Sequence, residues 1–169
     1  MNSSLHSLLL RLYRELDVWV SPLAPLVARI VFGQAFAITG WGKLQNLDRV
    51  IGFFTDLGIP LPGLQAPMVA VLEFVGGLLL VFGLGTRLVA MLLLSTMIVA
   101  LATADRASLL QGFVLDESFA NVTPLPFVVA LLWLIAKGAG RVSVDRVLAN
   151  RVAGNRVVVE GGAVEPAAF

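Results

Sequence analysis

Four apolar stretches alternate with short polar connections along the chain, and they predict four membrane-spanning helices. They cover about residues 22–44, 64–85, 87–104 and 122–137. Each comes near the roughly 20 residues that a helix needs to cross about 30 Å of hydrocarbon. Lipid offers the backbone no hydrogen-bond partners, so each stretch is expected to be a helix and not a strand. The turn between the second and third stretches is so short that these two helices are expected to be antiparallel neighbours.

A different pattern precedes the first stretch. Leucine and valine recur at helical spacing over residues 5–20, and charged residues, among them Arg11, Arg14 and Glu15, take the remaining positions. This pattern predicts an amphipathic helix over residues 1–21 in the membrane interface; a short helix packed on the end of the bundle is the alternative. The charges also interrupt the run that a cleavable signal peptide would need, so none is expected.

The expected fold class is therefore all-α: an integral membrane four-helix bundle with an N-terminal amphipathic interfacial helix. The bundle domain is expected over residues 22–148, and residues 149–169 are expected to form a polar, flexible cytoplasmic tail.

Composition supports the membrane assignment and excludes several kinds of chemistry. The chain of 169 residues is 58% hydrophobic and only 14% charged, whereas a soluble domain is about 25% charged. It contains no cysteine and one histidine, which excludes a disulfide framework, a thiol relay, a cysteine-ligated iron–sulfur cluster and bis-histidine haem ligation within one chain. No metal site and no intrinsic cofactor are expected. The net charge of +1 gives no reason to expect a nucleic-acid partner.

The distribution of lysine and arginine predicts the orientation of the helices, because cytoplasmic flanks are enriched in positive charge. One side of the expected bundle would hold eight basic residues: Arg11, Arg14, Arg87, Lys137, Arg141, Arg146, Arg151 and Arg156. The other side would hold three: Lys43, Arg49 and Arg106. We therefore expect a multi-pass protein with both termini in the cytoplasm.

Glu73 is the charged residue that most needs an explanation. No other charge lies between residues 57 and 86. An acid near the centre of a membrane span costs about 3 kcal/mol or more unless it is paired, protonated or hydrated. Such acids usually face the bundle interior and often mark a functional site. Glu73 is therefore expected to face inward, as a functional group or, alternatively, as a hydrogen-bonded packing residue.

Small residues indicate where Glu73 points. Ala70, Gly76 and Gly77 share its helical face, and Gly33 and Gly40 lie on one face of the first stretch. Small residues let two helices approach closely in a membrane. The Glu73 face is therefore expected to meet the first stretch.

Four polar residues form the candidate ligand or proton pocket: Glu73, Arg29, Gln34 and Lys43. Gln34 is expected at the depth of Glu73. Arg29 is expected to pair in part with Glu73, the alternative being that it reaches the lipid headgroups. Lys43 is expected to reach the headgroups beside Trp41, since long basic side chains do so near helix ends.

The order and spacing of six short motifs resemble the DoxX family of small bacterial and archaeal membrane proteins. The motifs are residues 26–33 (LVARIVFG), 40–44 (GWGKL), 54–60 (FTDLGIP), 72–79 (LEFVGGLL), 84–87 (LGTR) and 140–147 (GRVSVDRV). The resemblance covers about residues 22–148.

The resemblance implies a place in the bacterial or archaeal cytoplasmic (inner) membrane and a link to redox chemistry. The family is named after a subunit associated with thiosulfate:quinone oxidoreductase and terminal quinol oxidase assemblies. The function expected from it is a subunit or accessory of a quinone-linked redox system, with a polar pocket around Glu73 that takes a quinone, and not a self-sufficient enzyme. The alternative is a non-enzymatic scaffold or a small proton-coupled transporter. The expected partners are the lipid bilayer, subunits of a redox complex, or a second copy of the chain.

Overall fold

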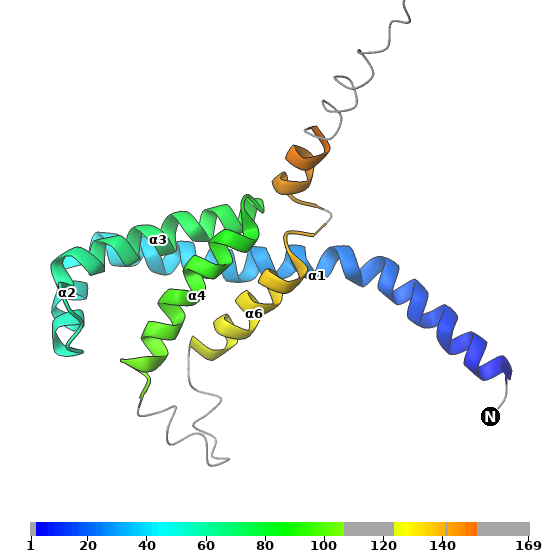
Figure 1. Cartoon of the computed structure of the whole chain (residues 1–169), viewed down its shortest axis with the longest axis horizontal. Helices are drawn as coiled ribbons and strands as arrows, with labels where there is room; N and C mark the ends of the chain where they lie inside the picture. The colour runs from blue at the N-terminus through cyan, green and yellow to red at the C-terminus, as the bar shows by residue number, and fades with distance from the viewer. Residues whose placement is uncertain (1–2, 107–123, 141, 152–169) are drawn as a thin grey trace, which may run out of the picture.

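The computed structural model describes residues 3–106, 124–140 and 142–151, with side chains from residue 23 onward. All regular elements in these ranges are helices (Figure 1). They are α1 (Ser3–Gln45), α2 (Leu47–Asp56), α3 (Pro62–Phe82), α4 (Thr86–Ala102) and α6 (Pro124–Lys137), followed by a helical segment at residues 144–151. The predicted all-α class is confirmed.

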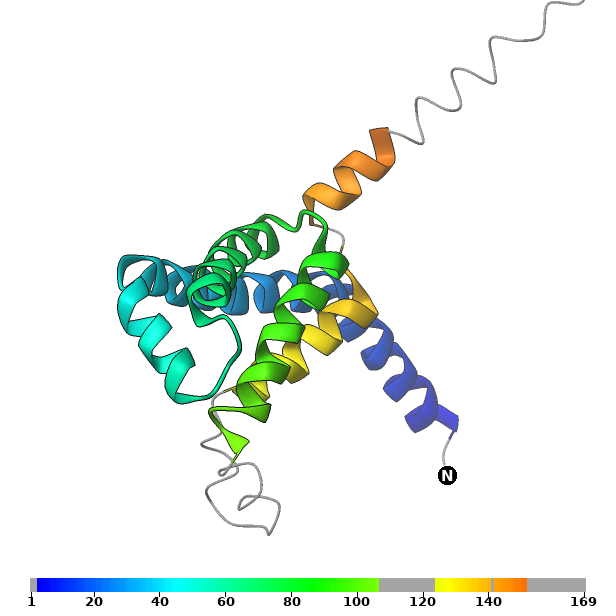
Figure 2. The same ribbon diagram turned by 60° about the vertical axis from the view of Figure 1, so that its left-hand side comes forward.

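Four of the helices form a closed ring of contacts: α1 packs on α3, α3 on α4, α4 on α6, and α6 on α1. Figures 1 and 2 show α4 and α6 side by side and inclined to the pair formed by α1 and α3. The buried core lies where the two pairs meet, and its members are Phe36, Leu80, Val89, Ala90, Leu93, Leu131 and Leu134. This is the membrane four-helix bundle that the sequence predicted.

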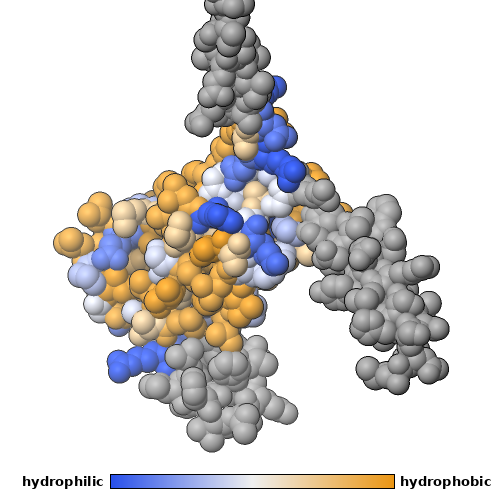
Figure 3. Space-filling model, turned by 45° about the vertical axis from the view of Figure 1, so that its right-hand side comes forward, coloured by the Kyte–Doolittle hydropathy of each residue, from blue (hydrophilic) through white to orange (hydrophobic). Residues whose placement is uncertain are grey.

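The outer surface of the bundle is hydrophobic. Large apolar side chains are exposed on every helix of the ring, such as Ile38, Val71, Leu88 and Val129, and Figure 3 shows this apolar surface. The segments Leu23–Gln45 and Pro62–Phe82, of 23 and 21 residues, are long and apolar enough to cross a membrane. The apolar helices α4 and α6 are shorter, with 17 and 14 residues.

The first helix differs from the prediction because α1 continues through residues 21 and 22 without a break. The expected interfacial helix and the first expected span are thus parts of one 43-residue helix. Pro22 and Pro25 lie inside it, and an internal proline removes one backbone hydrogen bond and bends a helix. Figure 1 shows the axis of α1 changing direction within its N-terminal half. The helix end expected near residue 21 is therefore a bend.

A short helix not anticipated from the sequence, α2, follows α1 directly. It occupies the connection between the first two expected spans, and it packs on α3. Val50, Phe53, Phe54 and Leu57 recur at the spacing of one helical face, and all four line the cavity described below. Residues 107–123 and 152–169 lie outside the described residues, so the start of the fourth expected span and most of the expected tail do too.

Candidate functional site

Helices α1 and α3 approach so closely that their backbones touch. A Cβ atom added at Gly40 would lie 2.3 Å from the backbone nitrogen of Phe74, and one at Gly77 would lie 2.4 Å from that of Ala37. One at Gly33 would lie 2.8 Å from the carbonyl oxygen of Gly77. Real side chains cannot occupy such positions, so glycine is required at this contact. The predicted close approach of the two helices is confirmed.

The glycine contact also sets the register of the two helices. Gly40 lies against Ala70 and Phe74, so Glu73 stands at the level of Gly40, one helical turn from Lys43. The prediction that Gln34 lies at the same depth as Glu73 is wrong. That expectation aligned the centres of the apolar stretches, whereas the positions that lack a side chain decide which residues of α1 and α3 face each other.

Lys43 and Glu73 form an ion pair across the contact between α1 and α3. The Lys43 Nζ atom donates to both carboxylate oxygens of Glu73 at 2.6 Å. The Glu73 side chain is 2% exposed and the Lys43 side chain 32%. The predicted burial of Glu73 is confirmed. Two predictions are wrong: Lys43 does not reach away toward the headgroups, and the partner of Glu73 is Lys43 and not Arg29.

Pairing explains how Glu73 can be buried in an apolar bundle. An unpaired carboxylate there would lose its hydration without compensation. A cation in direct contact offsets part of that loss, although the desolvation of both groups keeps the net gain small. The unequal exposure of the two side chains means that Glu73 is fixed inside the bundle while Lys43 also reaches an open space.

Arg29 belongs to a second polar cluster at the other end of the bundle. Its side chain is 1% exposed, its Nη2 atom donates to the carbonyl oxygen of Val142, and the Asp145 carboxylate acts on it electrostatically. Among the described residues, its Nε and Nη1 atoms have no hydrogen-bond partner. Its guanidinium packs on Gly83, where a Cβ atom would lie 1.5 Å from Nη1. Arg29 therefore holds the segment after α6 against the turn between α3 and α4.

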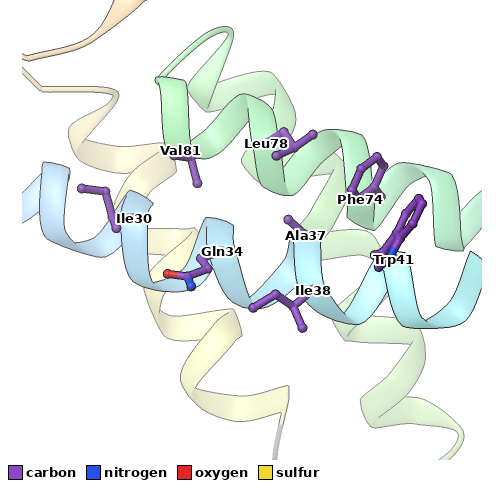
Figure 4. A pocket seen from close by; sticks show the side chains of 8 residues that line it. All are labelled: Ile30, Gln34, Ala37, Ile38, Trp41, Phe74, Leu78 and Val81. Atoms are coloured by element: carbon purple, nitrogen blue, oxygen red, sulfur yellow. The ribbon is translucent and has the colours of Figure 1, made fainter.

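Gln34 lies in a third place, an open groove of about 580 Å³ on the outer side of α1 and α3. Figure 4 shows its side chain among the apolar residues that line this groove. Ile38 and Trp41 in the same groove are 62% and 51% exposed, so the groove faces the surroundings of the bundle. Of the four residues predicted to form one pocket, the structure brings together only Glu73 and Lys43.

A cavity of about 520 Å³ opens beside this ion pair. Its volume lies within the range of small-molecule sites in proteins, about 300–1,000 Å³. Its walls come from the end of α1, from α2 and the connection after it, from the first half of α3, and from α4 with the residues that follow it. The residues lining it are Lys43, Arg49, Val50, Phe53, Phe54, Leu57, Ile59, Gln65, Met68, Val69, Leu72, Glu73, Ser95, Thr96, Met97, Val99, Ala100, Thr103 and Ala104.

The polar groups of the cavity are few and differ in their freedom to bind a ligand. The hydroxyl groups of Ser95, Thr96 and Thr103 donate to carbonyl oxygens of their own helix at 2.6–2.8 Å. Arg49 is exposed and has no ion pair with a described residue. The Gln65 amide donates to the carbonyl oxygen of Pro60 at 2.7 Å. The charged groups that a ligand would meet are therefore two donors, Lys43 and Arg49, and the buried carboxylate of Glu73. Three or more acidic or histidine side chains suitable for a metal do not come together anywhere in the described ranges.

Sequence reasoning found the charged centre of this cavity but missed its aromatic wall. Phe53 and Phe54 come from α2, and Met68 and Met97 from α3 and α4. The signal for α2 was present in the apolar spacing of residues 50–57, within the connection between the first two expected spans.

Comparisons with known proteins point to one group of membrane proteins. The sequence profile of the DoxX family matches residues 24–106, a range that includes Arg29, Lys43 and Glu73. The chain is 37% identical over 90 residues to "Putative oxidoreductase CatD" of Bacillus subtilis, covering 53% of this chain and 66% of that protein. It is 35% identical to "Inner membrane protein YqjF" of Escherichia coli, covering 73% and 90%. It is 34% identical to "Uncharacterized membrane protein Rv3486" of Mycobacterium tuberculosis, covering 77% and 84%. No solved structure gives a significant match.

Proposed function

The chain belongs to the DoxX family of membrane proteins, and we propose that it serves a quinone-linked redox system by holding a quinone head group beside Glu73 and Lys43. The observation that carries the proposal is a mostly apolar cavity of about 520 Å³ whose wall bears the Lys43–Glu73 ion pair, with the Glu73 carboxylate buried. The name of the Bacillus subtilis relative, "Putative oxidoreductase CatD", supports a redox role. In this proposal the electrons come from a partner subunit.

The shape and lining of the cavity suit a flat, mostly apolar ring. Phe53 and Phe54 offer aromatic faces and edges against which such a ring can pack. Met68 and Met97 add flexible side chains that adapt to an irregular ligand. Apolar walls with a few well-placed polar groups are the usual composition of sites for organic molecules.

The ion pair offers the two functions that quinone chemistry requires of a protein. Reduction of a quinone to a quinol consumes two electrons and two protons, and the protons are added to the two carbonyl oxygens. The Lys43 ammonium group can donate a hydrogen bond to one of these oxygens, because its side chain is more open than that of Glu73. Glu73 can relay these two protons one at a time, as a carboxyl group positioned for general acid–base work.

Blocking the cavity tests the proposal most directly. Ala100 lines the cavity on α4, whereas Ala102 on the same helix is exposed and does not line it. Ala100→Leu should reduce the affinity of the purified protein for a short-chain benzoquinone or naphthoquinone by about tenfold or more, because the added atoms occupy space needed by the ring. Ala102→Leu should bind as the wild type does. Isothermal titration in detergent measures both, and equal quinone affinity of the two variants would contradict a quinone in this cavity.

A second candidate, a scaffold without redox chemistry, is favoured by the place of the ion pair at the glycine contact. There Lys43 and Glu73 join α1 to α3, which is what a structural clamp would do. Under this alternative, or that of a small proton-coupled transporter, the purified protein binds no quinone. Proton flux into liposomes without a redox partner would then identify the transporter.

For the membrane placement, we propose four crossings of the cytoplasmic (inner) membrane with both termini in the cytoplasm. Relatives in Escherichia coli are named inner membrane proteins, which supports the proposed location in the inner membrane. Lys and Arg residues at the turn between α3 and α4, at the end of α6 and beyond it support the orientation.

A further inference from the structure

A second cavity, of about 510 Å³, lies at the end of the bundle where Arg29 is buried, away from Glu73. It is bounded by the start of α4, the end of α6 and the segment that follows α6. Its lining residues are Gly85, Arg87, Leu88, Lys137, Gly138, Ala139, Gly140, Ser143, Asp145 and Arg146. Three of these are cations, and they come from three different parts of the fold.

The local backbone holds the three cations around this cavity. Gly138 and Gly140 have φ angles of 78° and 77°, a conformation that favours glycine and ends the helix α6 with a change of chain direction. The Asp145 amide donates to the carbonyl oxygen of Gly83 at 3.1 Å. Arg146, the next residue, is therefore held near the start of α4 and lines the same cavity as Lys137.

The positive charge of the cavity is not balanced by the acid within it. Both carboxylate oxygens of Asp145 accept backbone N–H groups, from Gly85 at 2.7 Å and from Thr86 at 3.0 Å. The Arg87 guanidinium has one long contact, 3.5 Å from Nη2 to the carbonyl oxygen of Ala136. None of Arg87, Lys137 and Arg146 forms an ion pair with a described residue. Within the part of the chain that the structure describes, most of their donors are therefore open to an anion.

Apolar surface adjoins the cations. Leu88 is 62% exposed, and Val142 and Val144 are 57% and 39% exposed. Figure 3 shows hydrophilic residues gathered where the segment after α6 meets the bundle, beside hydrophobic surface. A ligand for this place needs an anionic group and an apolar part, which is the chemistry of an acidic phospholipid.

We propose that this cavity binds the phosphodiester of an anionic phospholipid from the adjacent leaflet, with the acyl chains along the exposed surface near Leu88. Arginine recognises phosphate through paired N–H donors, and lysine contributes a point charge. Basic pockets between transmembrane helices are suited to acidic headgroups. The bound lipid would bridge α4, α6 and the segment after α6. The proposal is independent of the quinone site.

The test uses the full-length protein in a neutral detergent with dioleoyl phosphatidylglycerol added in increments, and counts bound lipids by native mass spectrometry. We expect the wild-type protein to retain a bound phosphatidylglycerol at lipid concentrations at which it retains no phosphatidylcholine. Arg87→Gln combined with Lys137→Gln should weaken this binding by about tenfold, because each basic residue contributes to the attraction of acidic lipid.

Arg151→Gln is the matched control, because Arg151 lies on the helical segment after α6 but does not line the cavity. It should leave phosphatidylglycerol binding unchanged. Loss of lipid in Arg151→Gln equal to that in the double variant would mean general attraction to positive charge and would overturn the site. Arg146→Gln, a surface change, is an independent variant that should also weaken phosphatidylglycerol binding. If Arg146→Gln and a folded double variant both keep full binding, the proposed site is overturned.

A last arm distinguishes the lipid from a free anion. Inorganic phosphate at millimolar concentration should displace little phosphatidylglycerol, since phosphate lacks the apolar part that meets Leu88. If phosphate displaces all of the phosphatidylglycerol while chloride at the same ionic strength does not, the cavity is a site for soluble anions, and the proposal is contradicted.

Discussion

Removing one partner of the Lys43–Glu73 ion pair should destabilise the bundle, because the other charge is then left unpaired. Removing both charges should cost less than the sum of the two single changes. In Lys43→Met, the carboxylate of Glu73 remains 2% exposed without its cation. Breaking a fully buried pair in this way costs about 3–5 kcal/mol. Because the Lys43 side chain is 32% exposed, water can reach the pair, and we expect about 2–3 kcal/mol.

The other half of the cycle should be milder. In Glu73→Gln, the amide oxygen still accepts a hydrogen bond from Lys43, and the expected cost is about 1–2 kcal/mol. The double variant contains neither charge, so its loss of stability should be smaller than the sum of the two single losses by about 2 kcal/mol. Chemical unfolding in mixed micelles measures the three free energies.

Two further cycles serve as controls. Arg49 lines the same cavity but forms no ion pair with Glu73. Arg29 lies in the other polar cluster. Arg49→Met and Arg29→Met should each combine with Glu73→Gln additively, within about 0.5 kcal/mol. Additive behaviour of Lys43→Met with Glu73→Gln, or strong coupling of Arg29 to Glu73, would refute the pairing described here.

Three other predictions follow from the packing, the hydrogen bonds of Asp145 and the proposed topology. Gly40→Ala should lower the free energy of unfolding by about 2 kcal/mol or more, measured by chemical unfolding, because the new Cβ meets the α3 backbone. Gly42→Ala, whose Cβ would have nothing within 4 Å, should be neutral or slightly stabilising. Equal effects of the two changes would contradict the glycine contact. Asp145→Ala should lower stability by about 1 kcal/mol, because Gly85 and Thr86 at the start of α4 lose the carboxylate that accepts their N–H groups. A lower Tm would show this loss, and an unchanged Tm would argue against a stabilising role of these two hydrogen bonds. In this cysteine-free chain, Leu61→Cys should react with an impermeant maleimide from outside the cell and Ala149→Cys only after lysis; the reverse result would invert the topology.

The elements that carry a strong periodic or apolar signal could be predicted from the sequence. The long apolar helices and the inward direction of Glu73 follow from hydropathy and from the cost of a charge in lipid. The glycines that bring α1 and α3 together were also recognisable as small residues on matching faces. These features depend on local patterns, which a single sequence displays directly.

The pairing of charges could not be obtained in the same way, because it depends on the register between helices. Sliding α3 along α1 by a few residues changes whether Glu73 faces Gln34 or the turn next to Lys43. The register is decided by the contact of Gly40 with Ala70 and Phe74, a three-dimensional fit that hydropathy does not encode. The partner of Arg29 was hidden for a related reason: it is a backbone carbonyl far along the chain.

That distance has a consequence for the order in which the protein matures. Arg29 lies in the first helix to be synthesised, and the carbonyl of Val142 follows 113 residues later. Until the segment after α6 emerges from the ribosome, the guanidinium of Arg29 has no carbonyl to receive its hydrogen bond, and its burial would be costly. The bundle is thus completed only when the segment after α6 docks, so a chain ending before residue 142 should show faster proteolysis in the membrane than the full-length protein. Equal lifetimes would show that Arg29 is accommodated without its late partner.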